Sequence, residues 1–229
     1  MQSFEPRPLS DGRFVHFGFT SRSDGDFAPS NDPARLAQLR DQVSAGAWTS
    51  LNQVHGANVI WVETPGAGTG ADADVAITAT SDATLSIHTA DCAPVIFVAE
   101  EGLIGLAHAG WRGMDAGVLE ATVAAMRHRG AAQITAYVGP CIHQECYEFS
   151  VDELDRLSQK FGRTVVGKTA WGTPALDVPA ALSVVLERLE VTSDFSQCVC
   201  TACDEGWYSH RARQDQGRQV AYARITTHP

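Results

Sequence analysis

The alternation of apolar and polar residues divides the chain into short strands and amphipathic helices. Apolar runs or alternating patterns predict strands over residues 14–20, 48–54, 58–62, 73–78, 85–89, 103–107, 134–138, 198–201 and 219–225. Apolar residues at helical spacing predict helices from Pro33 and over residues 115–129, 151–161 and 179–189. Asn31 or Asp32 caps the first helix, whose apolar face carries Leu36, Leu39 and Val43.

Residues 85–126 are the densest part of this pattern. They contain three short apolar strands and then a glycine-rich turn into a helix. The glycine- and proline-rich stretch 64–70 is interpreted as a loop, because strand-like sequence resumes at residue 73. With 229 residues and no internal repeat or shift of composition, the simplest prediction is one mixed α+β domain over residues 1–229, with more strands than helices.

Composition narrows the classes of partner. The net charge of −10 gives no support to nucleic acid or an anionic membrane surface as a partner, although it leaves room for a basic pocket that binds phosphate. The N-terminus lacks the apolar core of a signal peptide, and Glu100 and Glu101 interrupt the longest apolar runs. We therefore expect a cytoplasmic protein without a membrane span, and cysteines that serve as thiols or metal ligands.

Three candidate metal ligands stand at predicted strand ends: His55, Cys92 and His108. Two imidazoles and a thiolate suit Zn²⁺, and three protein ligands leave the fourth position open, as in catalytic sites. The ligands are far apart in sequence, so spacing alone is weak evidence. The alternative is a buried cysteine with two hydrogen-bonded histidines.

Two arginines are candidates for anion binding. The glycine-rich turn after His108 leads into a helix, and exposed backbone N–H groups at such a turn favour an anion. Arg112, in this turn, and Arg22, in the loop 21–30, could hydrogen-bond a phosphate, the alternative being ordinary salt bridges. Arg22 is the better functional candidate because its loop offers no helical partner.

For the remaining cysteines and His88, the sequence gives no strong indication of a functional role. Cys198 and Cys200 would share one face of a strand, which permits metal ligation with Cys203 and equally permits small core side chains. No fourth ligand stands nearby at zinc-finger spacing. Cys141 and Cys146 are interpreted as packed thiols beside the pocket, and His88 as a strand histidine with its hydrogen bonds satisfied.

Several motifs resemble, in order, the signature of one bacterial family. They are NQVHG at 52–56, TADCAP at 89–94, HAGWRG at 108–113 and GPCI at 139–142, with further matches in FTSR at 19–22 and WYSHR at 207–211. The family has long been labelled multicopper polyphenol oxidase or laccase-like, and is now regarded as zinc-dependent purine nucleoside phosphorylases. The resemblance covers nearly the whole chain. Where the family usually has Ser-Tyr-Arg-Arg, this chain has Ser209-His-Arg-Ala-Arg213, so either Arg211 or Arg213 takes the second arginine's place.

The resemblance implies a single layered α/β/β/α domain with mixed sheets and a bound Zn²⁺ held by His55, Cys92 and His108. It implies phosphorolysis of adenosine, inosine and S-methyl-5'-thioadenosine and deamination of adenosine. Arg22 falls on the family arginine that contacts phosphate or substrate, and Asp91 is a candidate proton shuttle by adjacency alone. The metal would polarise the reacting group. Purine nucleosides and phosphate are the expected partners of a monomer or homodimer.

Two other functions remain as alternatives. A copper-dependent polyphenol oxidase needs many imidazoles, often as His-x-His pairs, and this chain has eight histidines and no such pair. A cysteine–histidine hydrolase, such as an amidase acting on cell-wall precursors, would use Cys92 as nucleophile and His108 as base. A purely structural zinc module is disfavoured because it would normally supply four ligands.

Overall fold

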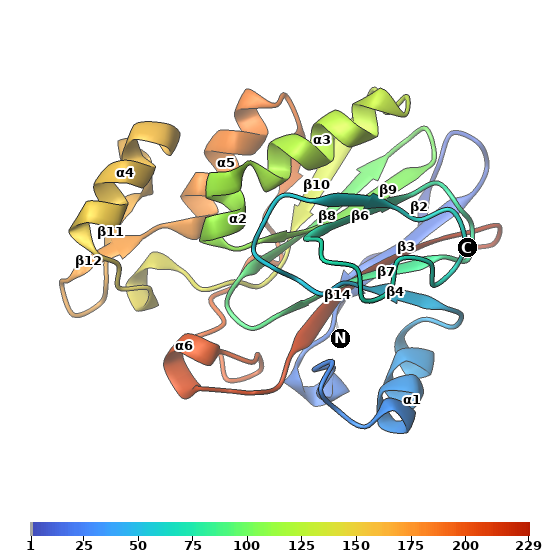
Figure 1. Cartoon of the computed structure of the whole chain (residues 1–229), viewed down its shortest axis with the longest axis horizontal. Coiled ribbons are helices and arrows are strands. Elements are labelled where there is room, and N and C mark those ends of the chain that lie inside the picture. The colour runs from blue at the N-terminus through green and yellow to red at the C-terminus, as the bar shows by residue number, and fades with distance from the viewer. Residues whose placement is uncertain (1) are drawn as a thin grey trace.

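Two six-stranded sheets pack against each other at the centre of the molecule (Figure 1). The computed structural model describes residues 2–229. The first sheet has the order β1-β3-β14-β7-β4, with β2 paired to β3. Its strands are β1 Gln2–Ser3, β2 Arg7–Pro8, β3 Phe14–Phe19, β4 Trp48–Ser50, β7 Thr84–Thr89 and β14 Gln219–Thr226.

The second sheet has the order β13-β10-β8-β9-β6-β5. It is formed by β5 Val59–Trp61, β6 Val75–Thr78, β8 Ala93–Ala99, β9 Leu103–Ala109, β10 Ile134–Val138 and β13 Thr192–Asp194. Both sheets are mixed, because β4–β7, β5–β6 and β10–β13 pair in parallel and the other pairs are antiparallel. A small hairpin of β11 Val166–Lys168 and β12 Pro174–Leu176 stands apart.

Helices cover the outer faces of both sheets (Figure 1). Helix α1 Pro33–Val43 packs on the first sheet, and α2 Trp111–Ala116, α3 Val118–His128, α4 Val151–Phe161 and α5 Val178–Arg188 lie on the side of the second. A short α6, His210–Arg213, precedes β14. The fold is therefore a single α+β domain whose layers follow the expected α/β/β/α order.

Strand β14 shows how the sequence pattern creates these layers. Ala221, Ala223 and Ile225 join the core between the two sheets. Val220 and Tyr222 point the other way and join the core beneath α1. Successive side chains of a strand point to opposite faces, so an uninterrupted apolar run serves two cores at once.

The chain crosses from one sheet to the other between β7 and β8. Strand β7 belongs to the first sheet and β8 to the second, so the three residues 90–92 bridge the layers. Asp91 in this crossing has a φ of 87°, a left-handed conformation that a non-glycine residue adopts only when its surroundings hold it there. The crossing therefore fixes Cys92 at a point that both sheets share.

The predicted elements are largely confirmed, with three corrections. Residues 198–201 are not a strand: the strand in this region is β13, and Cys200 forms only an isolated bridge with Cys141. The predicted strand 48–54 ends at Ser50, because Asn52 pairs singly with Asp72 and the chain then turns toward His55. The predicted helix 115–129 is two helices separated at Gly117, whose φ is 90°. None of the helices within residues 2–229 is both long and apolar enough to traverse a lipid bilayer.

Candidate metal centre and cavity

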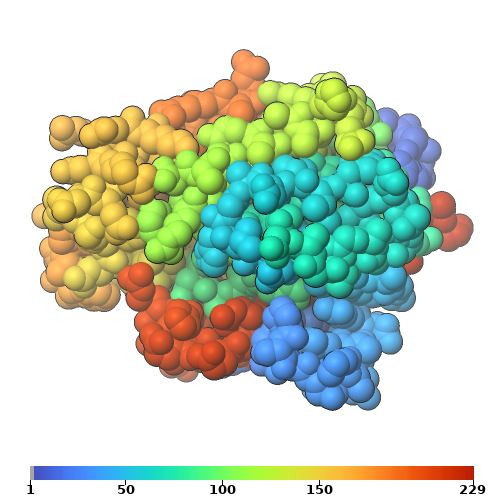
Figure 2. All heavy atoms as spheres, viewed as in Figure 1, coloured from blue at the N-terminus to red at the C-terminus, as the bar shows by residue number. Residues whose placement is uncertain are grey.

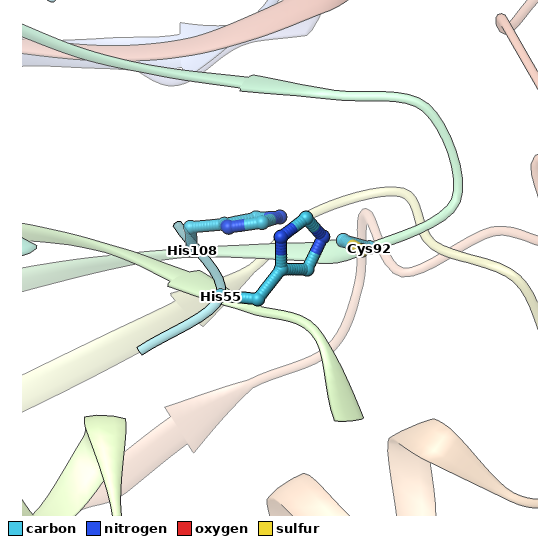
Figure 3. A group of neighbouring side chains, drawn as sticks. All are labelled: His55, Cys92 and His108. Atoms are coloured by element: carbon cyan, nitrogen blue, oxygen red, sulfur yellow. The ribbon is translucent and has the colours of Figure 1, made fainter. Parts of the chain in front are cut away.

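The structure brings His55, Cys92 and His108 together (Figure 3). Their ligand atoms all lie within 4.8 Å of one another, and the two imidazole rings meet edge to face with centroids 4.8 Å apart. His55 comes from the loop between β4 and β5, Cys92 from the crossing turn, and His108 from the end of β9. The predicted trio is thus one compact group of ligand atoms.

Asp74 positions both histidines, and sequence reasoning missed it. Its side chain is fully buried and accepts hydrogen bonds from the backbone N–H groups of Val54, His55 and Gly56 at 3.2, 3.0 and 2.7 Å. These bonds hold the turn at His55, where φ is 59°. Asp74 Oδ1 also lies 2.8 Å from Nδ1 of His108. A carboxylate accepts this bond from N–H, so Nε2 of His108 is left as the ligand atom.

In the absence of a metal ion, the electrostatics of the trio favour a Cys92 thiolate and a protonated His108. Burial raises the pKa of the Cys92 thiol, but the charge of His108 and hydrogen bonds from His108 and His55 outweigh it and lower the pKa to about 6. Burial lowers the pKa of His108, but the Cys92 thiolate and Asp74 raise it to about 9. A thiolate is the form of cysteine that binds a metal or attacks an electrophile.

Gly110 leaves the space in which the side chains of Cys92 and His55 approach each other. A Cβ atom at this position would lie 2.9 Å from Sγ of Cys92 and 3.4 Å from Cδ2 of His55. Gly110 is also the residue before α2, so the turn after β9 passes directly against the ligand group. Close packing against Cys92 and His55 therefore explains the glycine at this position of the predicted turn. The later part of the predicted turn is helical from Trp111 onward.

The trio lies in a cavity of about 1000 Å³. Residues 29–40 and residues 210–218, from opposite ends of the chain, both contribute to its lining, and Figure 2 shows these regions side by side in blue and red. Although the whole protein is acidic, its cavity wall carries four arginines against three acidic residues. The arginines are Arg40, Arg112, Arg211 and Arg218, and the acidic residues are Asp91, Glu148 and Glu153. The local charge therefore suits an anionic ligand.

Asp91 connects the crossing turn to the C-terminal part of the cavity. Its carboxylate accepts hydrogen bonds from the hydroxyls of Thr201 and Ser209, both at 2.7 Å, and from the backbone N–H of Arg211 at 2.6 Å. A carboxylate with three such donors serves to hold these segments in place. This arrangement favours a positioning role for Asp91 over the suggested proton shuttle.

The structure places Arg22 outside the lining of the cavity. Its guanidinium lies 2.5 Å from Asp215, donates to the carbonyls of Glu205 and Trp207, and stacks over Tyr208 with Cζ 4.3 Å from the ring centroid. Arg22 is thus not brought to the metal trio, but it holds the segment that leads to Arg211.

The two candidates for the second arginine are also separated. Arg211 lines the cavity, donates to the Glu148 carbonyl at 2.9 Å and lies over the ring of Tyr147. Arg213 is bound to Asp215 and to the carbonyls of residues 201, 202 and 207. Arg211 is therefore the one positioned to meet a ligand.

The structure contradicts the interpretation of His88 as a satisfied histidine. The side chain is buried in the cavity wall, and neither ring nitrogen has a hydrogen-bond partner among the described residues. Burial, reinforced by the charges of Arg40, Arg218 and His108, lowers the pKa of His88 to about 3. The neutral ring keeps one N–H donor and one acceptor, and both are buried without a partner in the described part of the chain.

The motifs, the fold and the trio agree with one sequence family. The profile described as multi-copper polyphenol oxidoreductase laccase matches residues 15–226. The chain belongs to this family. It is 34% identical to a purine nucleoside phosphorylase of Streptomyces coelicolor over 91% of this chain and 94% of that protein. It is also 34% identical to a purine nucleoside phosphorylase of Deinococcus radiodurans, over 93% and 83%.

Solved structures of this laccase family support the fold. The Neisseria meningitidis protein NMB0706 superposes with a TM-score of 0.79 at 23% identity, covering 99% of this chain and 100% of that chain. YlmD from Geobacillus stearothermophilus superposes with a TM-score of 0.73 at 26% identity, covering 93% and 91%. The two-sheet fold of this chain is therefore shared with both solved structures.

Proposed function

We propose that this protein is a zinc-dependent purine nucleoside phosphorylase that cleaves adenosine, inosine and S-methyl-5'-thioadenosine with phosphate, and also deaminates adenosine. The observation that carries the proposal is the group formed by His55, Cys92 and His108 in the wall of an arginine-lined cavity. The names of the Streptomyces and Deinococcus relatives point to the same activity.

The donor set fits zinc. The ligand atoms of His55, Cys92 and His108 are close enough to share one ion, and the low pKa of Cys92 supplies a thiolate at neutral pH. Asp74 fixes the tautomer of His108, as carboxylates commonly do for metal-bound imidazoles. A zinc ion held by this trio would supply Lewis-acid polarisation of the reacting group.

The protein's own residues would bind and orient the substrates. The guanidinium groups of Arg112 and Arg211 line the cavity and can bind phosphate, which must reach the anomeric carbon of the nucleoside. His88 lies in the cavity wall with both ring nitrogens buried and unpaired, and a small rotation of the neutral ring would offer its donor or its acceptor to the purine or the ribose. Trp111 and Phe149, which also line the cavity, offer apolar faces to the base.

A single incubation tests the activity. Protein of known metal content is mixed with adenosine, with and without phosphate, and adenine, hypoxanthine and inosine are identified by chromatography. We expect adenine only with phosphate, inosine without it, and loss of both products with a chelator or in Cys92→Ser. Cys203→Ser, an exposed cysteine outside the cavity, is the matched control and should keep both activities. A folded Cys92→Ser protein with full phosphorolysis would overturn the proposal.

One specific observation favours a cysteine hydrolase as the second candidate. Asp74, His108 and Cys92 form a hydrogen-bonded chain in the order that an activated thiol nucleophile requires. His55 is the residue that this function leaves unexplained. A hydrolase would be inactivated by alkylation of Cys92 and would retain activity in His55→Ala and in chelator, whereas the zinc enzyme would lose it.

The copper oxidase alternative gains no support from the geometry. Within residues 2–229, each cluster of potential ligands contains at most two histidines. A copper oxidase needs a mononuclear centre and a cluster, both rich in imidazole. Phenol oxidation with several copper equivalents per chain is the result that would restore this alternative.

A further inference from the structure

A second group of metal-type ligands lies outside the cavity. The triplet Cys198, Cys200 and Cys203 does not act as one unit, because the structure divides it between two clusters. Cys198 lies with Cys141 and His143, and Cys200 and Cys203 lie with Cys146. None of the residues of either cluster lines the cavity that holds the first trio.

The pairing of β10 with β13 explains why these residues meet. The two strands run parallel, so the segments that follow their carboxyl ends lie side by side. Cys141 donates its backbone N–H to the carbonyl of Val199, and Thr201 donates to the carbonyl of Cys141. Cys141 and His143 after β10 are thereby placed against Cys198 after β13.

The distances in the first cluster match those of a tetrahedral zinc site. A zinc ion with Zn–S of about 2.3 Å and Zn–N of about 2.0–2.1 Å separates two sulphurs by about 3.8 Å, and a sulphur from a nitrogen by about 3.6 Å. Sγ of Cys141 and Sγ of Cys198 are 3.7 Å apart, and Sγ of Cys198 is 3.6 Å from Nε2 of His143. All three ligand atoms lie within 4.8 Å of one another.

The surroundings of His143 support the same assignment. Its other ring nitrogen, Nδ1, lies 3.8 Å from the carboxylate of Glu145. At this distance the carboxylate is an electrostatic partner of the ring, which favours a positively charged neighbour such as a metal ion, and it is not a hydrogen-bond acceptor. His143 and Cys198 also line a small cavity of about 200 Å³, which leaves room for a water molecule as fourth ligand.

The second cluster is less suitable. Sγ of Cys146 and Sγ of Cys203 are 3.3 Å apart, which is shorter than the edge of a zinc tetrahedron, and this cluster contains no imidazole. Cys203 is also exposed to solvent. These differences single out the first cluster, and they make Cys203 a control within the same segment.

We propose that Cys141, His143 and Cys198 bind a second Zn²⁺ ion that ties the turn after β10 to the loop after β13. The ion would sit behind the crossing turn, because Ile142 donates its backbone N–H to the carbonyl of Asp91, and Thr201 donates to the Asp91 carboxylate. Its role is structural: it holds the segments that position Asp91. This proposal is independent of the reaction catalysed in the large cavity.

Metal analysis of the full-length protein loaded with Zn²⁺ tests the proposal. We expect two zinc ions per chain in the unmodified protein, one in Cys198→Ser or His143→Gln, one in Cys92→Ser, and none in the double variant Cys92→Ser/Cys198→Ser. Cys203→Ser should retain two. One ion in the unmodified protein that survives in Cys198→Ser, or loss of the second ion in Cys203→Ser, would overturn the proposal. So would a disulfide between Cys141 and Cys198 in the zinc-loaded protein.

Cobalt substitution gives a second readout that does not depend on every variant folding. Thiolate ligands give Co²⁺ a charge-transfer absorption that scales with their number, and the two sites together supply three thiolates. Cys92→Ser should therefore keep about two-thirds of this absorption, because two of the three thiolates lie in the second site. Complete loss of the absorption in a folded Cys92→Ser protein would refute the second zinc site. It would not affect the proposal that Cys92 belongs to a metal site of its own.

Discussion

At the scale of single residues, one buried carboxylate organises the metal centre. Asp74 binds the turn that carries His55 and the ring of His108 at the same time, so two ligands depend on one side chain. A buried acceptor with this many donors is expensive to alter, because the donors lose their partners as well. Its effects on stability and on metal binding should therefore appear together.

Asp74→Asn tests this dependence. The amide can accept fewer of the four hydrogen bonds and places an N–H₂ group against donors, so we expect a loss of about 2–3 kcal/mol in the free energy of unfolding. Zinc affinity should fall by roughly 10–100-fold, as for other residues that orient a metal ligand. Denaturant unfolding and competition with a chromogenic chelator measure the two quantities. Asp72→Asn, an exposed neighbour, is the control.

The pKa of Cys92 predicts a distinctive pH dependence in the metal-free protein. The folded-state pKa is lowered from the usual 9.0 to about 6, so the thiolate is present above pH 6 and is lost as the pH falls through that value. Alkylation of Cys92 by iodoacetamide, followed by peptide mass spectrometry, should rise near pH 6. Alkylation of Cys203 in the same sample should rise only above pH 9, because burial raises the pKa of that thiol. Equal profiles for the two cysteines would contradict the assigned electrostatics.

Replacing His88 should have opposite effects on the stability of the free protein and on the binding of adenosine. Both ring nitrogens are buried without partners in the described part of the chain, so an apolar residue should fit the free protein better. We expect His88→Leu to stabilise the free protein by roughly 1–2 kcal/mol while raising KM for adenosine. Thermal unfolding and steady-state kinetics measure the two effects. A destabilised variant with unchanged KM would show that His88 acts only in packing.

At the scale of elements, the site is built where strands end and the chain turns sharply. The crossing between β7 and β8, the end of β9 and the loop after β4 each contribute one ligand. Gly110 begins the turn from β9 to α2 and passes directly against Sγ of Cys92. The geometry of this turn therefore controls the space that is available to the metal.

Gly110→Ala should disturb the metal centre without disrupting the strands. The added methyl would lie 2.9 Å from Sγ of Cys92, so the sulphur or the turn must shift. We expect at least a tenfold loss of zinc affinity, of the order seen when a ligand's support is altered. Isothermal titration of the metal-free protein with Zn²⁺ measures this loss. In Gly206→Ala the methyl would meet only the side chain of Asp204, so affinity should not change.

The sequence predicted most elements but not how the strands pair. Periodicity located the start of α1 and both ends of α4 and α5 to within a residue, because each carries apolar positions at helical spacing. The segment 198–201 is apolar enough to suggest a strand, yet its backbone pairs only at Cys200. Pairing depends on contacts distant in sequence, so the parallel match of β10 with β13 could not be predicted from local pattern.

The dependence on contacts distant in sequence also explains which residues of the candidate site could be predicted and which could not. His55, Cys92 and His108 could be proposed because reactive side chains at strand ends are informative one by one. Asp74 stands immediately before a buried strand, where its sequence signal is that of an ordinary turn residue. Cys141 is buried in the core as interpreted, but its closeness to Cys198 could not be predicted, because it depends on which strands lie side by side.

At the scale of the whole molecule, segments from the N-terminal and C-terminal parts of the chain meet beside the cavity. Arg22 binds residues 205, 207 and 215, and the same segment carries Ser209 and Arg211, which bind Asp91 in the crossing turn. A continuous set of hydrogen bonds thus links the N-terminal loop, the C-terminal segment and the junction of the two sheets. Through this set, we expect Arg22 to act on phosphate binding by positioning Arg211.

Paired variants distinguish this indirect role from direct contact with phosphate. If Arg22 works by holding the segment 205–215, Arg22→Ala and Asp215→Asn both release Arg211, and both should raise KM for phosphate about tenfold, the equivalent of about 1.4 kcal/mol. The KM for adenosine should change much less, because the metal trio is untouched. Steady-state kinetics with phosphate varied at saturating adenosine provides the measurement. If Arg22 contacts phosphate itself, Arg22→Ala will raise that KM clearly more than Asp215→Asn, which leaves the guanidinium free to bind the anion and disturbs only the hydrogen bonds of Asp215 to Arg22, Ser209 and Arg213.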